Sequence, residues 1–206
     1  ELARLGTEAV ESFVERLLSY AVQELKPYSE DIKEISETFH PREWNEGAYA
    51  LQDEAYALGA MGEPALDALI KLLQYDDKWI KINAAFALGE IGEAAIPAIP
   101  ILIKQLKNDH HQVVRVTLDA LACIGGDVRG ALPIIRKLLT TSNPAWQEIP
   151  IGRGWTGENQ LRMNAMLLLL TSDISASEIE DLLVSTLQDP NGYVPALAIE
   201  ALSQDA

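Results

Sequence analysis

Apolar residues recur along most of this chain at the three- and four-residue spacing that is typical of amphipathic helices. The pattern also repeats over a longer distance. ALGAMG at 57–62, ALGEIG at 87–92 and ALACIG at 120–125 follow one another at offsets of 30 and 33 residues. Related helical segments are anchored at positions 50, 80, 113, 161 and 194. A period of this length indicates an array of stacked helical repeats.

A second helical pattern lies between the anchored segments, at 64–73, 94–106, 130–139 and 177–187. Each repeat is therefore predicted to contain a first helix (A), a short turn and the anchored helix (B), which usually ends at a glycine. Pro100 and Pro133 occupy equivalent positions, and they predict a bend in their A helices. Ser177, with Glu180 three residues later, predicts a capping box at the start of the last A helix.

The first 45 residues fit the repeat less well. The segment 7–25 has Val10, Phe13 and Leu17 on one side of an amphipathic helix, and a second helix is predicted at 29–39. We expect residues 1–45 to form an N-terminal helical cap and residues 46–206 to form the repeats. The alternative for the first 45 residues is a docking surface for a further domain.

Residues 80–92, with the sequence IKINAAFALGEIG, resemble the HEAT-like repeats of the phycobilisome-lyase type, whose pattern is approximately V-R-x-x-A-A-x-A-L-G-x-I-G. Lys81 stands in place of the arginine, Arg162 is retained in the repeat at 161–170, and Arg115 is displaced by one position. The resemblance covers residues 46–206. It implies an all-α, right-handed α-α superhelix (a HEAT-like solenoid) with an insertion at about 143–157. Because the family includes scaffolds, chromophore lyases and transport factors, the resemblance is more specific for fold than for function.

The charge balance narrows the class of partner. The chain has 16 basic and 31 acidic residues, a formal net charge of −15 and a pI near 4.5. Binding to nucleic acid or to an anionic membrane requires a basic surface, so neither partner is expected. The plain interpretation of the charge is solubility, and the sharper one is a protein partner with a basic surface. The single cysteine, Cys123, excludes an internal disulfide and a four-cysteine zinc site, and we expect a cytoplasmic location.

The first two repeats carry a candidate binding groove. B helices usually line the concave side of such arrays, and helical spacing places a set of aromatic and polar residues on one face of them. These residues are Tyr49, Asp53, Tyr56, Trp79, Asn83, Phe86 and Glu90. Aromatic side chains with a few polar groups are good anchors for a protein or peptide. The alternative is that the aromatic residues only pack between neighbouring B helices.

The insertion at 143–157 is the second candidate site. Loops of this length in compact repeats are usually functional or disordered, and Trp146 and Trp155 argue against disorder. We expect the insertion to border or gate the groove, with Arg153 as a polar contact. The alternative is that its tryptophans cover the stack. The segment 152–157 matches G-x-G-x-x-G, but the predicted helices around it do not provide the βαβ unit that a dinucleotide site needs.

The remaining candidates point away from catalysis. His110-His111 is expected to be a solvated turn rather than a weak metal site, and Cys123 a buried packing residue without a base beside it. We therefore predict no metal, no cofactor and a non-catalytic protein-binding scaffold. The last helix, 194–202, has no following helix to cover its apolar face, which suggests self-association.

Three alternative functions stay open at this stage. The resemblance implies a phycobilin lyase or another chromophore-handling protein as the second interpretation. The chain could also be a regulatory repeat region of a larger enzyme. DNA repair, known among HEAT-like glycosylases, is opposed by the acidic charge.

Overall fold

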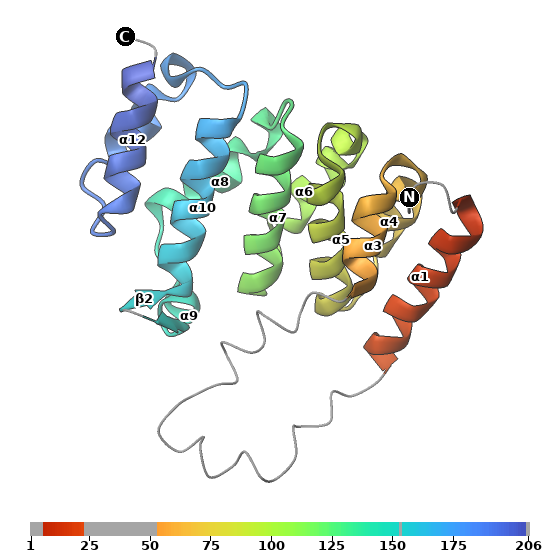
Figure 1. Cartoon of the computed structure of the whole chain (residues 1–206). Helices are drawn as coiled ribbons and strands as arrows, with labels where there is room; N and C mark the ends of the chain where they lie inside the picture. The colour runs from red at the N-terminus through yellow and green to blue at the C-terminus, as the bar shows by residue number, and fades with distance from the viewer. Residues whose placement is uncertain (1–5, 23–52, 153, 205–206) are drawn as a thin grey trace, which may run out of the picture.

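A computed structural model describes residues 6–22, 53–152 and 154–204 of the chain (Figure 1). It shows two layers of helices arranged as an all-α solenoid. The front layer in Figure 1 contains the B helices: α3 (Asp53–Met61), α5 (Lys78–Ile91), α7 (His111–Ile124), α10 (Gly157–Thr171) and α12 (Tyr193–Gln204). The layer behind contains the A helices: α4 (Leu66–Leu72), α6 (Ile99–Gln105), α8 (Leu132–Thr140) and α11 (Glu180–Thr186). Neighbouring B helices pack on one another, and α5, α7, α10 and α12 each also pack against the A helix that precedes them in the chain.

The A helices begin differently from the prediction. Each starts with a 3₁₀ segment: η3 (Glu63–Ala65), η4 (Gly92–Ala98), η5 (Arg129–Ala131) or η6 (Ala176–Glu178). Pro100 and Pro133 lie in the first turns of the α-helices that follow, where the missing N–H has no intrahelical partner to lose. The predicted mid-helix bend is therefore wrong. The predicted capping box is also displaced, because the residues that cap this segment are Ser175 and Glu178 rather than Ser177 and Glu180.

Glycines end the B helices of the first three repeats, as the sequence predicts. Gly62, Gly92 and Gly125 have φ angles of +72°, +68° and +70°. A side chain at this backbone conformation is strained, so glycine is the residue that lets the chain reverse into the next A helix. The helix α10 has no such glycine and ends at Ser172 in extended conformation.

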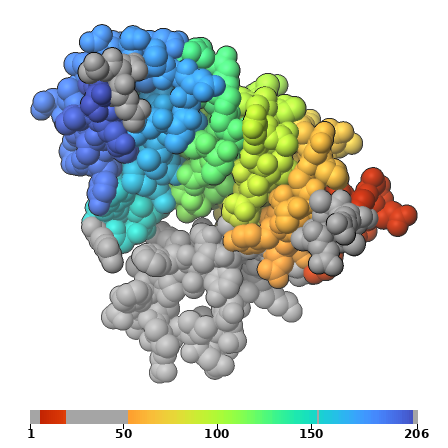
Figure 2. Space-filling view, turned by 45° about the horizontal axis from the view of Figure 1, so that its top comes forward, coloured from red at the N-terminus to blue at the C-terminus, as the bar shows by residue number. Residues whose placement is uncertain are grey.

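A single hydrophobic core runs the length of the array. It extends from Val10 in α1 to Ala201 in α12 and consists mainly of alanine, leucine and isoleucine. Ala84, Ala85 and Ala87 of α5 are almost completely buried, which allows the neighbouring B helices to approach. Figure 2 shows the successive repeats from α3 to α12 lying against one another. This is how stacking buries a surface that one helix pair could not cover alone.

The first helix of the predicted cap is present as α1 (Gly6–Val22). It packs on α3 at the end of the array opposite α12 (Figure 1). Val10 and Leu17 are buried, and Arg16 forms an ion pair of 2.7 Å with the buried Glu54. The second helix, predicted at 29–39, lies outside the described residues, so the boundary of the cap at residue 45 stays a prediction.

The insertion folds into a helical turn followed by a short ribbon. The turn is α9 (Pro144–Gln147), and β1 (Pro150–Gly152) pairs antiparallel with β2 (Trp155–Thr156). The sequence did not predict this ribbon. The side chain of Thr156 then caps α10 through a reciprocal capping box with Asn159.

One stretch of the described residues, 78–105, is long and apolar enough to cross a membrane by length and composition. In the structure this stretch is not one straight helix. It comprises α5 and α6, of 14 and 7 residues, joined by η4. The chain reverses at Gly92, and neither α-helix reaches the roughly 20 residues of a membrane-spanning helix.

Candidate functional site

The exposed side chains of the B helices form a face that we call the B face. In its first half, the rings of Tyr56 and Phe86 meet edge to face, with centroids 4.7 Å apart. Tyr56 keeps 50% of its surface exposed, whereas Phe86 is half-buried. Asp53 and Glu90 are exposed on the same two helices. The first half of the B face therefore presents aromatic surface with carboxylates on the same helices.

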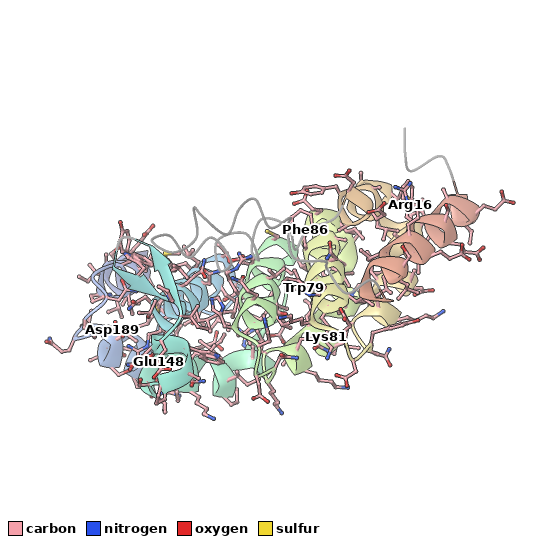
Figure 3. All side chains as sticks on the ribbon, turned by 90° about the horizontal axis from the view of Figure 1, so that it is seen from below. Arg16, Trp79, Lys81, Phe86, Glu148 and Asp189 are labelled. Atoms are coloured by element: carbon pink, nitrogen blue, oxygen red, sulfur yellow. The ribbon has the colours of Figure 1, made fainter. Side chains whose placement is uncertain are left out.

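Trp79 lies near the start of α5, on the helix that also carries Phe86 (Figure 3). Its ring is half-buried, with the Lys78 ammonium 4.7 Å from the ring centroid and the His110 ring 6.4 Å away. His110 directly precedes α7. Trp79 therefore makes contacts inside the array, as the packing alternative requires, and still retains part of its surface.

Asn83 does not lie on the B face. It is only 1% exposed, and its side-chain Nδ2 donates to the carbonyl oxygen of Trp79 at 2.9 Å. The prediction that it lines the groove is wrong, because α5 lies between α3 and α7 and exposes only a narrow stripe. Tyr49 and Arg153 lie outside the described residues, so their roles stay predictions.

Polar side chains link α7 to α10 in the middle of the B face. The Arg115 guanidinium donates to Gln112 at 2.8 Å and to Asp119 at 3.0 Å, and Asn164 donates to the other oxygen of Asp119. Partial burial raises the pKa of Asp119, although the charge of Arg115 acts in the opposite direction. Sequence reasoning missed this cluster because Asn164 lies 45 residues after Asp119 and shares no local pattern with it.

His111 is a buried residue, so the predicted solvated turn is wrong at this position. Its Nε2 lies 3.2 Å from Oε1 of Gln160. Burial lowers the pKa of His111. The hydrogen bond with Gln160 opposes this shift, and the charges of Arg115 and His110 act with burial. The imidazole is therefore neutral at neutral pH. Within the described residues, no group of three or more His, Cys, Asp or Glu side chains could hold a metal ion.

Cys123 is exposed near the end of α7, which contradicts its predicted burial. Partial desolvation, followed by the negative charges of Asp119 and Glu90, raises the pKa of its thiol. A protonated thiol is a weak nucleophile. This environment does not activate Cys123 for covalent catalysis.

The insertion lies along the edge where the B helices begin. Trp155 meets Tyr193 edge to face at 5.0 Å, at the first residue of α12. Trp146 donates from Nε1 to the carbonyl oxygen of Asp109 at 3.3 Å, in the loop that also carries His110. The two tryptophans thus contact the starts of different repeats. Whether they gate a partner stays a prediction.

An open pocket of about 410 Å³ adjoins this contact. It is lined by Gly154, Trp155, Asn159, Pro190, Asn191, Gly192, Tyr193 and Ala196. Its two aromatic rings, with asparagines among the lining residues, suit a ring or an apolar side chain of a partner. The only sequence signal for Tyr193 was its place immediately before the anchor at 194, the position that Trp79 occupies in its own repeat.

Comparison with known proteins agrees with this architecture. The family model for HEAT repeats matches residues 55–122. The crystal structure of an engineered protein is similar with a TM-score of 0.56 and 21% sequence identity, over 95% of this chain and 78% of that chain. No curated protein matches the chain. The repeated helix pairs, the glycine stops and these matches show a HEAT-like repeat fold, with the match to the HEAT-repeat family itself at residues 55–122.

Proposed function

We propose that this protein is a non-catalytic scaffold that binds another protein through its B face. HEAT repeats generally mediate protein–protein interactions. The observation that carries the proposal is the partly open aromatic pair on adjacent helices, in which Tyr56 is 50% exposed and backed by Phe86. A rigidly supported aromatic ring loses little conformational freedom when it binds, so it is an effective anchor.

The acidic groups of the B face support a partner with a basic surface. Asp53 and Glu90 are exposed on the helices that carry the aromatic pair. Asp119 continues this stripe along α7, and the protein as a whole has a net charge of −15. Complementary charge accelerates association and excludes acidic partners. In this proposal Trp146 and Trp155 border the same surface and contact the edge of the partner.

The test begins with proteins from the source organism that the intact chain retains, identified by mass spectrometry. Tyr56→Ala should weaken binding of the retained partner at least about tenfold, as expected for an aromatic anchor. Tyr75→Ala is a matched control, since Tyr75 is 45% exposed but lies in the turn after α4 and not on a B helix. Equal affinity of the two variants would contradict the proposed surface.

Trp79→Ala tests the extent of the same surface. Because the ring is half-buried, this variant needs circular dichroism and thermal unfolding beside the binding measurement. We expect weaker partner binding at unchanged helical content. Loss of binding that only parallels loss of folding would assign Trp79 to the packing of the array.

The pocket at Trp155 and Tyr193 favours a second candidate, the handling of a flat conjugated molecule such as a bilin. Its volume of about 410 Å³ and its two aromatic rings are compatible with stacking on part of such a ligand. Mixing the protein with a bilin and recording the absorption spectrum distinguishes this candidate. A saturable spectral shift that Trp155→Ala abolishes would support it.

A further inference from the structure

An exposed aromatic ring and an exposed carboxylate are neighbours on the first half of the B face. The ring of Tyr56 meets that of Phe86 edge to face at 4.7 Å, and Tyr56 keeps 50% of its surface exposed. Glu90 follows Phe86 by one helical turn, so both project from the same side of α5. Across the interface with α3, a Cβ added to Gly59 would lie 2.7 Å from the Cβ of Glu90 and 3.4 Å from its Cγ. Gly59 follows Tyr56 by three residues, so the Glu90 side chain starts about one helical turn from the exposed ring.

Glu90 is the carboxylate of this surface that keeps its full charge available to a partner. Within the described residues, none of the ion pairs involves Glu90. Two arginines flank the surface, on α1 and on α7, and each is already engaged. Arg16 pairs with the buried Glu54 at 2.7 Å, and Arg115 pairs with Asp119 at 3.0 Å.

The electrostatic field over this surface is negative. Asp53 is exposed at the start of α3, on the helix that carries the ring. On α7, partial desolvation raises the pKa of the Cys123 thiol, and the negative charges of Asp119 and Glu90 raise it further. The two carboxylates therefore act on the same part of the surface from adjacent helices. A cationic side chain of a partner would be attracted to it.

Both lysines of α5 lie away from this carboxylate. The Lys78 ammonium is 4.7 Å from the centroid of the Trp79 ring, and Lys78 precedes Glu90 by twelve residues, or about 18 Å along the helix. Lys81 lies on the other side of α5 from Phe86 (Figure 3). Neither lysine is therefore placed to neutralise Glu90.

We propose that Tyr56 and Glu90 form a subsite of the B face that binds an arginine side chain of a protein partner. A guanidinium is planar, so it can stack on the exposed part of the Tyr56 ring while it donates two hydrogen bonds to the Glu90 carboxylate. An ammonium is a compact, strongly hydrated charge that does not combine these two contacts. This inference rests on the proposed function, because it names the side chain that the B face selects in a basic partner.

Two peptides of equal charge test the selectivity. The probes are fluorescein-labelled peptides with four repeats of Gly-Ser-Arg or of Gly-Ser-Lys, and fluorescence anisotropy gives the dissociation constant of each from the intact chain. At about 0.1 M salt the Debye length is about 10 Å, so long-range attraction by the net charge of −15 is screened and is the same for both peptides. We expect the arginine peptide to bind at least about tenfold more tightly. Equal affinities, or binding of neither peptide, would overturn the proposal.

Glu90→Gln and Tyr56→Leu locate the preference. Each variant should bring the ratio of the two dissociation constants close to one, because an amide carries no charge and leucine has no ring. Both side chains are exposed, so the circular dichroism spectra should not change. Glu93→Gln is the matched control, since Glu93 is exposed on η4 in the A layer and its replacement changes the net charge equally. An arginine preference that persists in either Glu90→Gln or Tyr56→Leu also overturns the proposal.

The partner that the intact chain retains separates this inference from the proposed function. If Tyr56→Ala weakens the binding of that partner and Glu90→Gln does not, the B face binds it without an arginine at this subsite, and the inference is wrong. If Tyr56→Ala has no more effect than Tyr75→Ala, the proposed function itself is wrong.

Discussion

The helix α7 packs against α5 on one side and against α10 on the other, and these two interfaces differ. We call the α5–α7 interface the first seam and the α7–α10 interface the second seam. Towards α5, the backbone of α7 approaches a glycine, and a Cβ added to Gly89 would lie 3.1 Å from the Cα of Ala120. Towards α10, the contact uses polar side chains, where Asp119 accepts from Asn164 and His111 lies beside Gln160. The same repeat fold therefore uses close backbone packing at one seam and hydrogen bonding at the next.

The same difference separates the rest of the first half of the array, from α3 to α7, from the rest of the second half, from α7 to α12. A Cβ on Gly59 would lie 2.7 Å from the Cβ of Glu90, so the α3–α5 seam is also closed by glycine. The equivalent residues later in the chain are Ala122 and Leu170, which do not allow the same approach. The later repeats instead contain a buried ion pair between Arg162 and Asp189. The interfaces closed by glycine depend for their stability on close shape complementarity. The hydrogen-bonded interfaces depend on every buried polar group having a partner.

The A layer shows a related contrast, between a neutral hydrogen bond in the first half and charged pairs in the second. Between α4 and α6, Gln105 donates to the carbonyl oxygen of Leu73 at 2.9 Å. Between α8 and the last repeat, Arg129 pairs with Glu178 and Arg136 pairs with Asp181, both at 2.8 Å. Hydrogen bonds from the Arg129 guanidinium and then from the backbone N–H of Ser175 lower the pKa of Glu178 to about 2. These exposed ion pairs align the last repeat, but they are screened by water and salt and contribute little to its stability.

The largest expected effect is at the buried ion pair. Arg162 and Asp189 have side chains only 13% and 4% exposed, and Arg162 also donates to the carbonyl oxygen of Leu138. Arg162→Met would leave Asp189 buried and uncompensated, at a cost of about 3–5 kcal/mol in the free energy of unfolding. Urea unfolding measures this. Arg136→Met is the control and should change stability little, because its pair with Asp181 is exposed.

Adding a methyl group at the first seam should have the next largest effect on the free energy of unfolding. Gly89→Ala would push α5 away from α7 and lower the free energy of unfolding by about 1–3 kcal/mol. Gly130→Ala is the comparison, since its added Cβ would meet only the end of Ile103 at 3.4 Å. Thermal unfolding of the two variants separates close packing from the general effect of replacing glycine. Equal melting temperatures would show that the seam can relax.

The contribution of the second seam to the free energy of unfolding should depend on pH, whereas that of the first seam should not. Because the pKa of His111 is lowered in the folded state, the unfolded chain binds more protons at mildly acidic pH. The free energy of unfolding should therefore fall as the pH decreases below the ordinary histidine value of about 6.5. His111→Gln should flatten this part of the profile, measured by urea unfolding between pH 7.5 and 5. The same slope in the variant would assign the pH dependence to other groups.

The smallest effect concerns the exposed thiol at the first seam. The carboxylates of Asp119 and Glu90 contribute to the raised pKa of Cys123. Glu90→Gln should lower that pKa and speed alkylation of the thiol about two- to threefold at pH 8. Iodoacetamide labelling followed by mass spectrometry measures the rate. Asp53→Gln serves as a charge control, since Asp53 does not contribute to the raised pKa of the Cys123 thiol.

Much of the fold was predictable because its signals are local and repeated. The anchors at 80, 113, 161 and 194 fall at the starts of α5, α7, α10 and α12, and the glycines at 62, 92 and 125 end B helices. The candidate site was less predictable. Exposure depends on both neighbouring helices, so helical spacing alone placed the buried Asn83 on the surface and the exposed Cys123 in the core.

The sequence by itself determined the repeat period, the helix pairs and the position of the insertion, since each follows from spacing within about 15 residues or from comparison of one repeat with another. Only the tertiary structure decided which polar groups pair. Asp119 meets Asn164, Arg162 meets Asp189, and Trp155 meets Tyr193 across 45, 27 and 38 residues. These partners come together only when the helices stack, because hydrogen bonds and ring contacts act over a few ångströms and no local pattern records them.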